Sequence, residues 1–157
     1  FLPRAIEAGI PIFGICRGHQ SIAVQRGLGL LQNMYHETSV KDRADLEHSV
    51  NFNRLNEDVD NFLNKIGFSQ SSVKVNSLHH QIVNLTQEES TSEKVPEGTL
   101  PLGFYGSLNK KNKSDYALFV EAFAYPEENI ITVQWHPEEI YDDFSIAAIE
   151  YLLTCKK

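Results

Sequence analysis

The chain has 157 residues, of which 41% are hydrophobic and 22% are charged, and its net charge is −7. This length allows one domain with a hydrophobic core and is too short for two domains of ordinary size, so we expect residues 1–157 to form a single domain. The acidic balance argues against nucleic acid as a partner, because sequence-independent binding needs a basic surface, and against docking on an anionic membrane. No apolar run approaches the roughly 20 residues that a membrane span requires.

The first 27 residues predict a helix, a strand and a second helix in close succession. Residues 3–8 have a proline in the first turn and a glycine after them, which is typical of a short helix. The continuous apolar run 10–15 has the length of a strand and no polar alternation, as in a parallel strand buried on both faces. Residues 18–27 then have an apolar side and end in Gly27, which predicts a helix.

The rest of the chain predicts further strands and helices around one long polar stretch. Residues 86–116 are dominated by Ser, Thr, Glu, Lys, Gly and Pro, so we expect an exposed loop excursion there. The strand-like segments are 28–34, 49–55, 72–78 and the two apolar runs that flank a turn at 126–129; residues 36–48 read as a loop, and 56–67 and 142–157 as helices. Together these elements predict a three-layer α/β domain with a mostly parallel sheet.

Cys16 lies between Gly14 and Gly18, where the predicted strand gives way to a helix. A residue in this position has the geometry of a nucleophile elbow, in which a strained turn lifts the side chain clear of the sheet. We expect a Cβ at either glycine to crowd the neighbouring backbone, and the helix N-terminus to lower the pKa of the thiol. The backbone N–H of Arg17 can then donate to a developing oxyanion. The alternative is that Cys16 is a small buried apolar residue in a glycine-rich turn.

A cysteine nucleophile needs a base, and the segment "IITVQWHPEE" provides His136 and Glu138 at the end of an apolar run. Alternate residues of a strand point the same way, so the imidazole and the carboxylate can project together. His136 would act as the base toward Cys16, and Glu138 would orient the imidazole and stabilise its charge. The alternative is that both are ordinary surface residues. No cluster has the spacing of metal ligands, so we expect neither a metal nor an organic cofactor.

The segment "PIFGICRGHQ", followed far downstream by "VQWHPEE", resembles the class I glutamine amidotransferase superfamily, whose motifs are G-x-C-x-G-x-Q and H-P-E. The resemblance implies a flavodoxin-like α/β fold with a Cys–His–Glu triad that cleaves γ-glutamyl amides through a γ-glutamyl thioester. It implies that Cys16 is the nucleophile, His136 the base and Glu138 the third member of the triad. Gln20 matches the glutamine of the motif, which in the superfamily lies at the glutamyl portion of the substrate.

Within the superfamily, three details resemble the free-standing γ-glutamyl hydrolase branch, which includes γ-glutamyl-γ-aminobutyrate hydrolases and folate polyglutamate hydrolases. These are Arg17 after the cysteine, Trp135 before the histidine, and the segment "NSLHHQ" at 76–81. The resemblance implies an omega peptidase in which His79 and His80 line the mouth of the active site and help to place the γ-glutamyl group or its leaving amine. The alternative for these histidines is a turn at a strand end with solvated side chains.

The resemblance also implies elements that precede the elbow. Members of the superfamily usually carry a longer segment before the cysteine, which forms the first strands of the sheet and supplies a second oxyanion donor, whereas 15 residues precede Cys16 here. We therefore expect either a partner that supplies these elements or association of the chain with itself.

The expected function is thiol-dependent hydrolysis of a small γ-glutamyl amide. Two cysteines cannot form a disulfide framework, so we expect free thiols and a cytoplasmic protein. One alternative is a glutaminase subunit that supplies ammonia to a synthase. Another is a catalytically inactive homologue that acts as a structural or interaction subunit.

Overall fold

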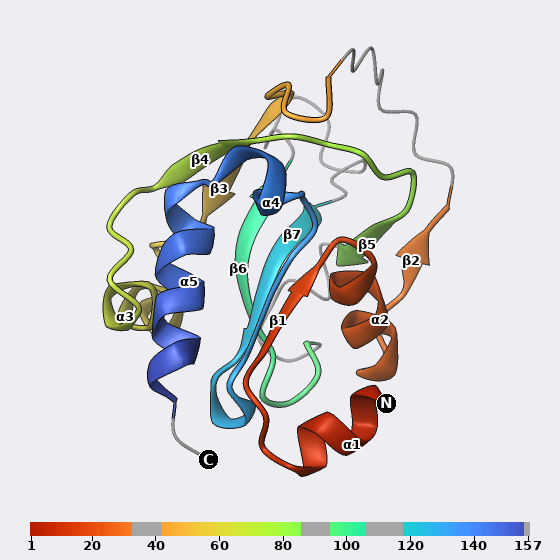
Figure 1. Cartoon of the computed structure of the whole chain (residues 1–157), viewed down its shortest axis with the longest axis vertical. Helices are drawn as coiled ribbons and strands as arrows, with labels where there is room; N and C mark the ends of the chain where they lie inside the picture. Colours follow the sequence, from red (N-terminus) through yellow and green to blue (C-terminus); the bar gives the residue numbers. More distant parts are fainter. Residues whose placement is uncertain (33–41, 86–94, 106–117, 156–157) are drawn as a thin grey trace.

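One mixed sheet organises the molecule, and helices cover both of its faces (Figure 1). The structure, a computed structural model, describes residues 1–32, 42–85, 95–105 and 118–155. The helices are α1 (Leu2–Glu7), α2 (Arg17–Gln25), α3 (Glu57–Lys65), α4 (Pro137–Ile140) and α5 (Asp143–Thr154), with a short 3-10 helix η1 (Pro126–Glu128). The strands are β1 (Ile12–Ile15), β2 (Leu30–Leu31), β3 (His48–Phe52), β4 (Ser72–Val75), β5 (Ile82–Leu85), β6 (Leu100–Tyr105), β7 (Leu118–Tyr125) and β8 (Ile130–Val133).

The strands follow the order β1-β8-β7-β6-β3-β4, and β5 pairs with both β7 and β2. Among the described strands, β1 and β8 form the one parallel pair, and every other pair is antiparallel. The α/β class is confirmed, but the prediction of a mostly parallel sheet is wrong in strand direction. The turn between β7 and β8 spans only residues 126–129, and so short a connection can join only antiparallel neighbours.

Most of the predicted elements are present. Helices α1, α2, α3 and α5 overlap the four predicted helices, and β1, β3, β4, β7 and β8 overlap predicted strands. The strand expected at 28–34 is reduced to β2, and residues 33–41 lie outside the described part of the chain. β5 and α4 occur where neither was predicted.

β6 corrects the expectation of an exposed excursion at 86–116, because it is an internal strand between β7 and β3. Pro101 and Gly103 give this segment the composition of a loop, and register shifts against β7 accommodate both residues. Glycine is required at 103 because a Cβ there would lie 2.7 Å from Cγ1 of Val50. Apart from 95–99, the rest of the expected excursion lies outside the described residues.

The two faces of the sheet bury separate apolar cores. α3 and α5 pack on one face, where Leu63 and Phe144 are fully buried. α1 and α2 pack on the other face, over Ile22 and Phe123. This helix–sheet–helix arrangement is the three-layer architecture that the sequence predicts. In the described ranges, no helix is long and apolar enough to cross a membrane.

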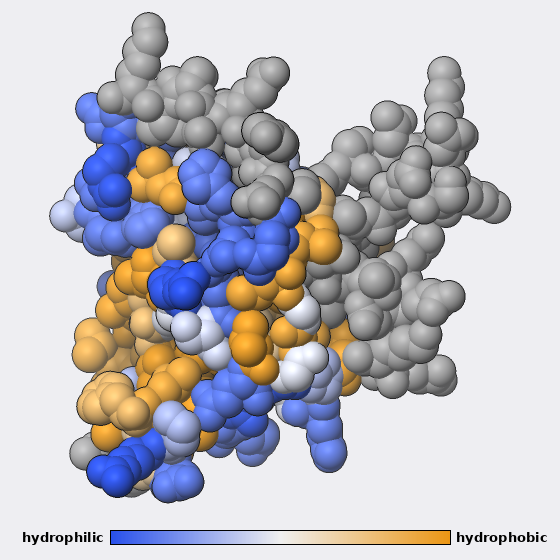
Figure 2. Space-filling model, turned by 90° about the vertical axis from the view of Figure 1, so that its right-hand side faces the viewer, coloured by the Kyte–Doolittle hydropathy of each residue, from blue (hydrophilic) through white to orange (hydrophobic). Residues whose placement is uncertain are grey.

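β1 lies at one edge of the described sheet and is bordered by exposed apolar side chains. Pro11 and Phe13 line an apolar hollow together with Ile149 and Leu153 of α5, and Leu153 is largely exposed. Orange, apolar surface is also visible on the side of the molecule that carries α1 and α2 (Figure 2). An edge strand in apolar surroundings is a place where a further strand can add to a sheet.

Candidate active site

Cys16 occupies a strained turn between β1 and α2. Its backbone has φ 47° and ψ −98°, a combination that a residue with a Cβ rarely adopts and that costs on the order of 1–3 kcal/mol. The Cys16 N–H donates to the carbonyl of Val133 at 2.8 Å, and the Cys16 carbonyl accepts the first helical bond from Gln20 at 3.1 Å. The end of β8 and the first turn of α2 therefore hold the strained residue from both sides.

The two glycines of the elbow have different roles. A Cβ at Gly14 would lie 3.0 Å from Cγ2 of Thr132 and 3.3 Å from the carbonyl carbon of Gly18, so a larger residue does not fit there. The prediction of similar crowding at Gly18 is wrong, because a Cβ at that position meets nothing within 4 Å. Space beside the first turn of α2 is therefore open.

Burial raises the pKa of the Cys16 thiol, and the negative charges of Glu138 and Glu121 raise it further. The backbone N–H of Arg17 and its guanidinium act in the opposite direction but do not compensate. The first N–H of the helix lowers this pKa as expected, but the net shift is upward, because desolvation outweighs the contribution of the helix. The thiol form of Cys16 is therefore favoured at neutral pH, and attack by the sulfur needs a base that accepts its proton.

The side chains of His136 and Glu138 are hydrogen-bonded next to the same end of the sheet. The Nδ1 of His136 lies 2.7 Å from Oε1 of Glu138. A carboxylate can only accept, so Nδ1 donates and the neutral imidazole keeps its lone pair on Nε2. Burial raises the pKa of Glu138, but the hydrogen bond from His136, a backbone hydrogen bond and the charges of His136 and Arg43 together lower it by more, so the carboxylate is ionised at neutral pH.

The contact does not arise from alternate positions of a strand. β8 ends at Val133, and the residues after it turn into α4, with His136 at the N-cap. Pro137 explains the difference, because its fixed φ suits the first position of a helix. β1 and β8 are parallel neighbours, with Ile15 opposite Val133. The carboxyl ends of these two strands therefore deliver Cys16 and the His136–Glu138 pair to one edge of the sheet.

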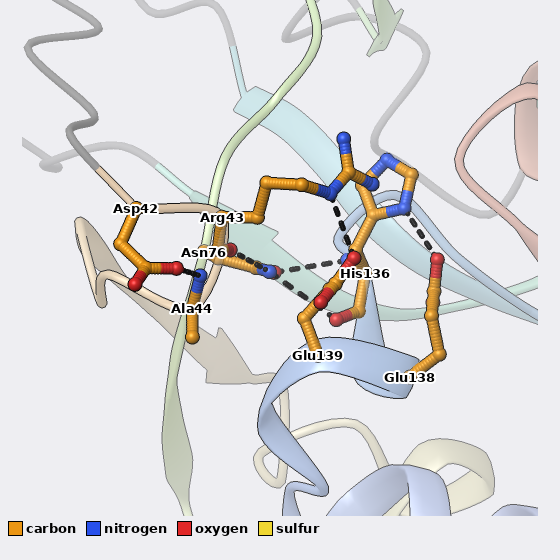
Figure 3. Close-up of polar contacts among 7 residues, drawn as sticks. All are labelled: Asp42, Arg43, Ala44, Asn76, His136, Glu138 and Glu139. Carbon is orange, nitrogen blue, oxygen red and sulfur yellow. Dashed lines mark hydrogen bonds and ion pairs between the residues drawn. The ribbon is translucent and has the colours of Figure 1, made fainter.

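Asn76 braces the backbone of His136 (Figure 3). Its Oδ1 accepts from the His136 N–H at 2.9 Å, and its Nδ2 donates to the His136 carbonyl at 3.2 Å. The same Nδ2 donates to the carbonyl of Arg43 at 2.7 Å, and the Arg43 side chain pairs with Glu139 of α4. A loop and a short helix that are far apart in sequence are thus held together around the imidazole.

Gln20 lies on the buried side of α2 and makes two hydrogen bonds. Its Nε2 donates to the carbonyl of Gln81 at 2.8 Å and to Oε1 of Gln134 at 3.1 Å. Gln134 in turn donates through Nε2 to Sγ of Cys16 at 3.6 Å. Gln20 therefore lies close to the nucleophile, with its amide engaged by protein groups.

The two adjacent histidines differ in exposure. The side chain of His79 is buried, with Nε2 3.8 Å from Oε1 of Glu121, and Nδ1 lies 3.1 Å from the carbonyl of Gln81. His80 is exposed. The expectation that both line the mouth of the site is therefore wrong for His79, which lies in the interior because it compensates a buried carboxylate.

Several residues near the site have roles that the sequence does not predict. Glu121 is fully buried in β7; burial raises its pKa, but the imidazole of His48, whose Nε2 lies 3.7 Å from Oε2 of Glu121, and the charges of His79 and His19 lower it by more. Its position as the one charged residue in the apolar run "LFVEAFAY" is a signal that could have identified it. His19 is fully buried between Thr132 and Val120, and desolvation lowers its pKa to about 4.

A hollow of about 350 Å³ opens beside α2, immediately after Cys16. Its lining residues are Arg17, Gln20, Ser21, Val24, Leu30 and Gln81. The guanidinium of Arg17 donates to the side-chain oxygen of Gln81 at 3.0 Å and is exposed. Within the described residues, no group of three or more His, Cys, Asp or Glu side chains could hold a metal ion.

A helix-flanked α/β sheet with a strained cysteine at the end of one strand and a His–Glu pair at the end of its neighbour defines a domain of the glutamine amidotransferase-like class. The chain belongs to the peptidase C26 family, whose model matches residues 1–99. The matched segment contains Cys16 and Gln20, while His136 and Glu138 lie beyond it.

Similar proteins agree with this class. The glutamine amidotransferase-like protein YvdE of Lactococcus lactis is 28% identical over 139 residues, which are 87% of this chain and 50% of that protein. The chain thus spans half the length of this curated relative. A glutamine amidotransferase from Thermotoga maritima has a TM-score of 0.50 at 15% identity, over 96% of this chain and 50% of that one. The glutaminase domain of CTPS from Trypanosoma brucei, with acivicin bound, has a TM-score of 0.55 at 18% identity, over 93% and 62%. At these identities the two structures support the fold alone.

Proposed function

We propose that the protein hydrolyses the γ-amide bond of a small γ-glutamyl compound through a thioester on Cys16. The observation that carries the proposal is a strained cysteine, hydrogen-bonded to the end of β8, beside the strand extension that presents His136 paired to Glu138 at 2.7 Å. Strain of this kind persists where the surrounding structure over-determines it, and it is concentrated at functional sites.

The reaction would begin with transfer of the Cys16 proton to Nε2 of His136 while Sγ attacks the γ-carbonyl carbon. The backbone N–H of Arg17 would donate to the oxygen that becomes negative. Collapse of this intermediate breaks the carbon–nitrogen bond, and His136 returns the proton to the leaving amine. Water, deprotonated by His136, then attacks the thioester, which releases glutamate and restores the thiol. Glu138 would stabilise the imidazolium in both halves of the reaction.

The raised pKa of Cys16 supports a mechanism in which the base acts during the attack. A resting thiolate would not need His136 as an acceptor of its proton, whereas a buried thiol does. The glutamyl portion would lie in the open space at Gly18 near Gln20, and the leaving amine in the hollow lined by Arg17. His80, which is exposed, would contribute at most to the outer part of this site.

The γ-glutamyl hydrolase branch is one reading of this chemistry, and a glutaminase subunit that supplies ammonia to a synthase is the second. The likeness in fold to the glutaminase domain of CTPS favours the second reading as much as the first. We also propose a cytoplasmic location, in which Cys16 and Cys155 would stay free thiols. Both also allow a further strand, from a partner or a second copy, to add beside β1.

Turnover of two substrates separates these readings. We would compare release of p-nitroaniline from γ-glutamyl-p-nitroanilide with release of ammonia from glutamine, using the wild type, Cys16→Ala and His136→Ala. The hydrolase reading predicts that the anilide is cleaved without a partner and that both variants lose at least about 10³-fold in rate. Cleavage of glutamine alone would favour the glutaminase reading. Anilide turnover that survives in Cys16→Ala would contradict both.

A further inference from the structure

We propose that Gln134 is a positioning residue that holds Sγ of Cys16 through an N–H···S hydrogen bond and stabilises the thiolate form. Its place in the γ-glutamyl hydrolysis rests on the function proposed above, but the hydrogen bond itself does not. The chain of contacts that carries the inference runs from the carbonyl of Gln81 through Gln20 and Gln134 to the sulfur.

The position of Gln134 is fixed by its backbone. It follows the last residue of β8, and its N–H donates to the carbonyl of Glu121 on β7 at 2.8 Å. Two strands pair with the same edge of β7 near this point. β8 pairs with β7 as far as Ala122, and the pairing of β5 with β7 begins at Val120. The side chain of Gln134 is fully buried, so both ends of its amide need partners.

The direction of each amide follows from a single carbonyl. The backbone oxygen of Gln81 can only accept, so the atom of Gln20 that lies 2.8 Å from it is the NH₂ group. The same NH₂ group lies 3.1 Å from the amide of Gln134 and donates its second hydrogen there, so the facing atom of Gln134 is the oxygen. The NH₂ group of Gln134 is then the end that faces Sγ of Cys16, at 3.6 Å. The contact with the Gln81 carbonyl therefore fixes which end of the Gln20 amide and of the Gln134 amide is the nitrogen.

A donor aimed at the sulfur is worth most when the sulfur is negative, because hydrogen bonds to charged groups are roughly twice as strong as neutral ones. The groups that act on the Cys16 charge are Glu138 on α4 and Glu121 on β7, which disfavour the thiolate, and Arg17 on α2, which favours it. Arg43 also interacts with the Cys16 charge. Gln134 adds a neutral donor from the end of β8.

The test measures the rate of alkylation of Cys16 by iodoacetamide as a function of pH, by intact mass, with Cys155→Ser as the background so that Cys16 is the one thiol. Gln134→Met keeps the length of the side chain and removes the donor. We expect the apparent pKa of Cys16 to rise by about one unit, which is about a tenfold slower alkylation at pH 7. Gln134→Glu replaces the donor with a negative acceptor and should slow alkylation further.

Gln20→Met tests the chain of contacts. It leaves Gln134 in place but removes the group that orients its amide, so we expect a smaller shift in the same direction. In the Gln134→Met background the same substitution should add nothing. The proposal is overturned if Gln134→Met, or Gln20→Met in the event that the first variant does not fold, titrates like the parent protein. Additive shifts in the double variant would overturn it as well.

The outcome is independent of turnover. A shifted titration without any γ-glutamyl hydrolysis would reject the proposed function and keep the role of Gln134. Hydrolysis together with an unshifted titration would support the proposed function and reject the role of Gln134.

Discussion

Two effects act in opposite directions on Cys16. Burial and nearby carboxylates raise the pKa of its thiol, while the first N–H of α2 lowers it. Glu138 has a double role, because it disfavours the Cys16 thiolate and at the same time stabilises a protonated His136. Once the negative charge has moved from the sulfur to the substrate oxygen, Glu138 still stabilises the imidazolium and no longer opposes a thiolate.

Glu138→Gln should separate these roles. Removal of the negative charge should lower the apparent pKa of Cys16, so alkylation near neutral pH becomes faster. Hydrolysis of γ-glutamyl-p-nitroanilide should become slower by about 10–1000-fold, because an amide does not fix the tautomer of His136 or stabilise its charge. The two rates, measured on one preparation, should move in opposite directions. If both fall, Glu138 acts on folding of the site and not on the imidazole.

At the same scale, the sequence predicts the positions of Cys16 and of the His136–Glu138 pair better than it predicts their surroundings. Cys16 and the His136–Glu138 pair are recognisable because each motif is local, at a glycine-flanked turn and around a proline. Asn76 and Gln134 are not recognisable, because their partners are 60 and 118 residues away in the chain. Long-range contacts of this kind depend on the pairing of strands, which no local pattern encodes.

At the scale of elements, β6 is the clearest case of a segment whose composition hides its structure. Pro101 is a residue that central strands avoid, and Gly103 is one that usually weakens them. Here Gly103 allows β6 to approach Val50 of β3, and this close approach decides the position. Helices were easier to predict, since α3 and α5 have caps at Asn56 and Asp142 that are visible in the sequence.

Gly103→Ala should destabilise the protein by about 1–3 kcal/mol, because the added Cβ would lie 2.7 Å from Val50 and 3.3 Å from Phe52. The measurement is urea unfolding followed by tryptophan fluorescence, since Trp135 is fully buried. Gly29→Ala is the matched control, because that glycine is exposed and a Cβ there meets nothing within 4 Å. Equal midpoints for the two variants would show that β6 does not pack as described.

At the scale of the whole molecule, strand direction was the part of the fold that the sequence could not predict. The apolar run of β1 correctly suggested a parallel partner and the short turn at 126–129 an antiparallel pair of β7 and β8, but β3, β4 and β6 give no local sign of the strand that lies next to them. The order of the sheet is set by contacts between distant segments, such as β1 with β8. The three-layer architecture was predictable because it depends only on which elements are apolar on one side or on both.

The buried histidine His19 makes the stability of the fold depend on pH. Its Nε2 donates to the carbonyl of Val120, its Nδ1 accepts from the hydroxyl of Thr132, and desolvation lowers its pKa to about 4. In the unfolded chain the pKa of this histidine is about 6.5. Between about pH 6.5 and pH 4 the unfolded chain is therefore protonated at His19, whereas the folded protein is not. Burial of the neutral imidazole therefore costs no stability above about pH 6.5, and the folded state loses stability relative to the unfolded chain as the pH falls toward 4.

The free energy of unfolding should therefore decrease by about 2–3 kcal/mol between pH 7 and pH 4.5 because of this one group. His19→Gln should be less stable than the wild type at pH 7, and the difference between the two proteins should shrink by that amount at pH 4.5. Urea unfolding at the two pH values measures both quantities. A difference that stays constant with pH would show that His19 is not buried in its neutral form.

If Cys16 is the nucleophile of a γ-glutamyl site, a reactive analogue of glutamine should label it covalently. The purified chain is treated with a diazo-ketone analogue of glutamine, which loses N₂ when a thiol attacks it, and the products are measured by intact mass. We expect a single adduct that is absent in Cys16→Ala and retained in Cys155→Ser. This expectation is contradicted if iodoacetamide modifies Cys16 while the analogue does not, or if the adduct survives in Cys16→Ala.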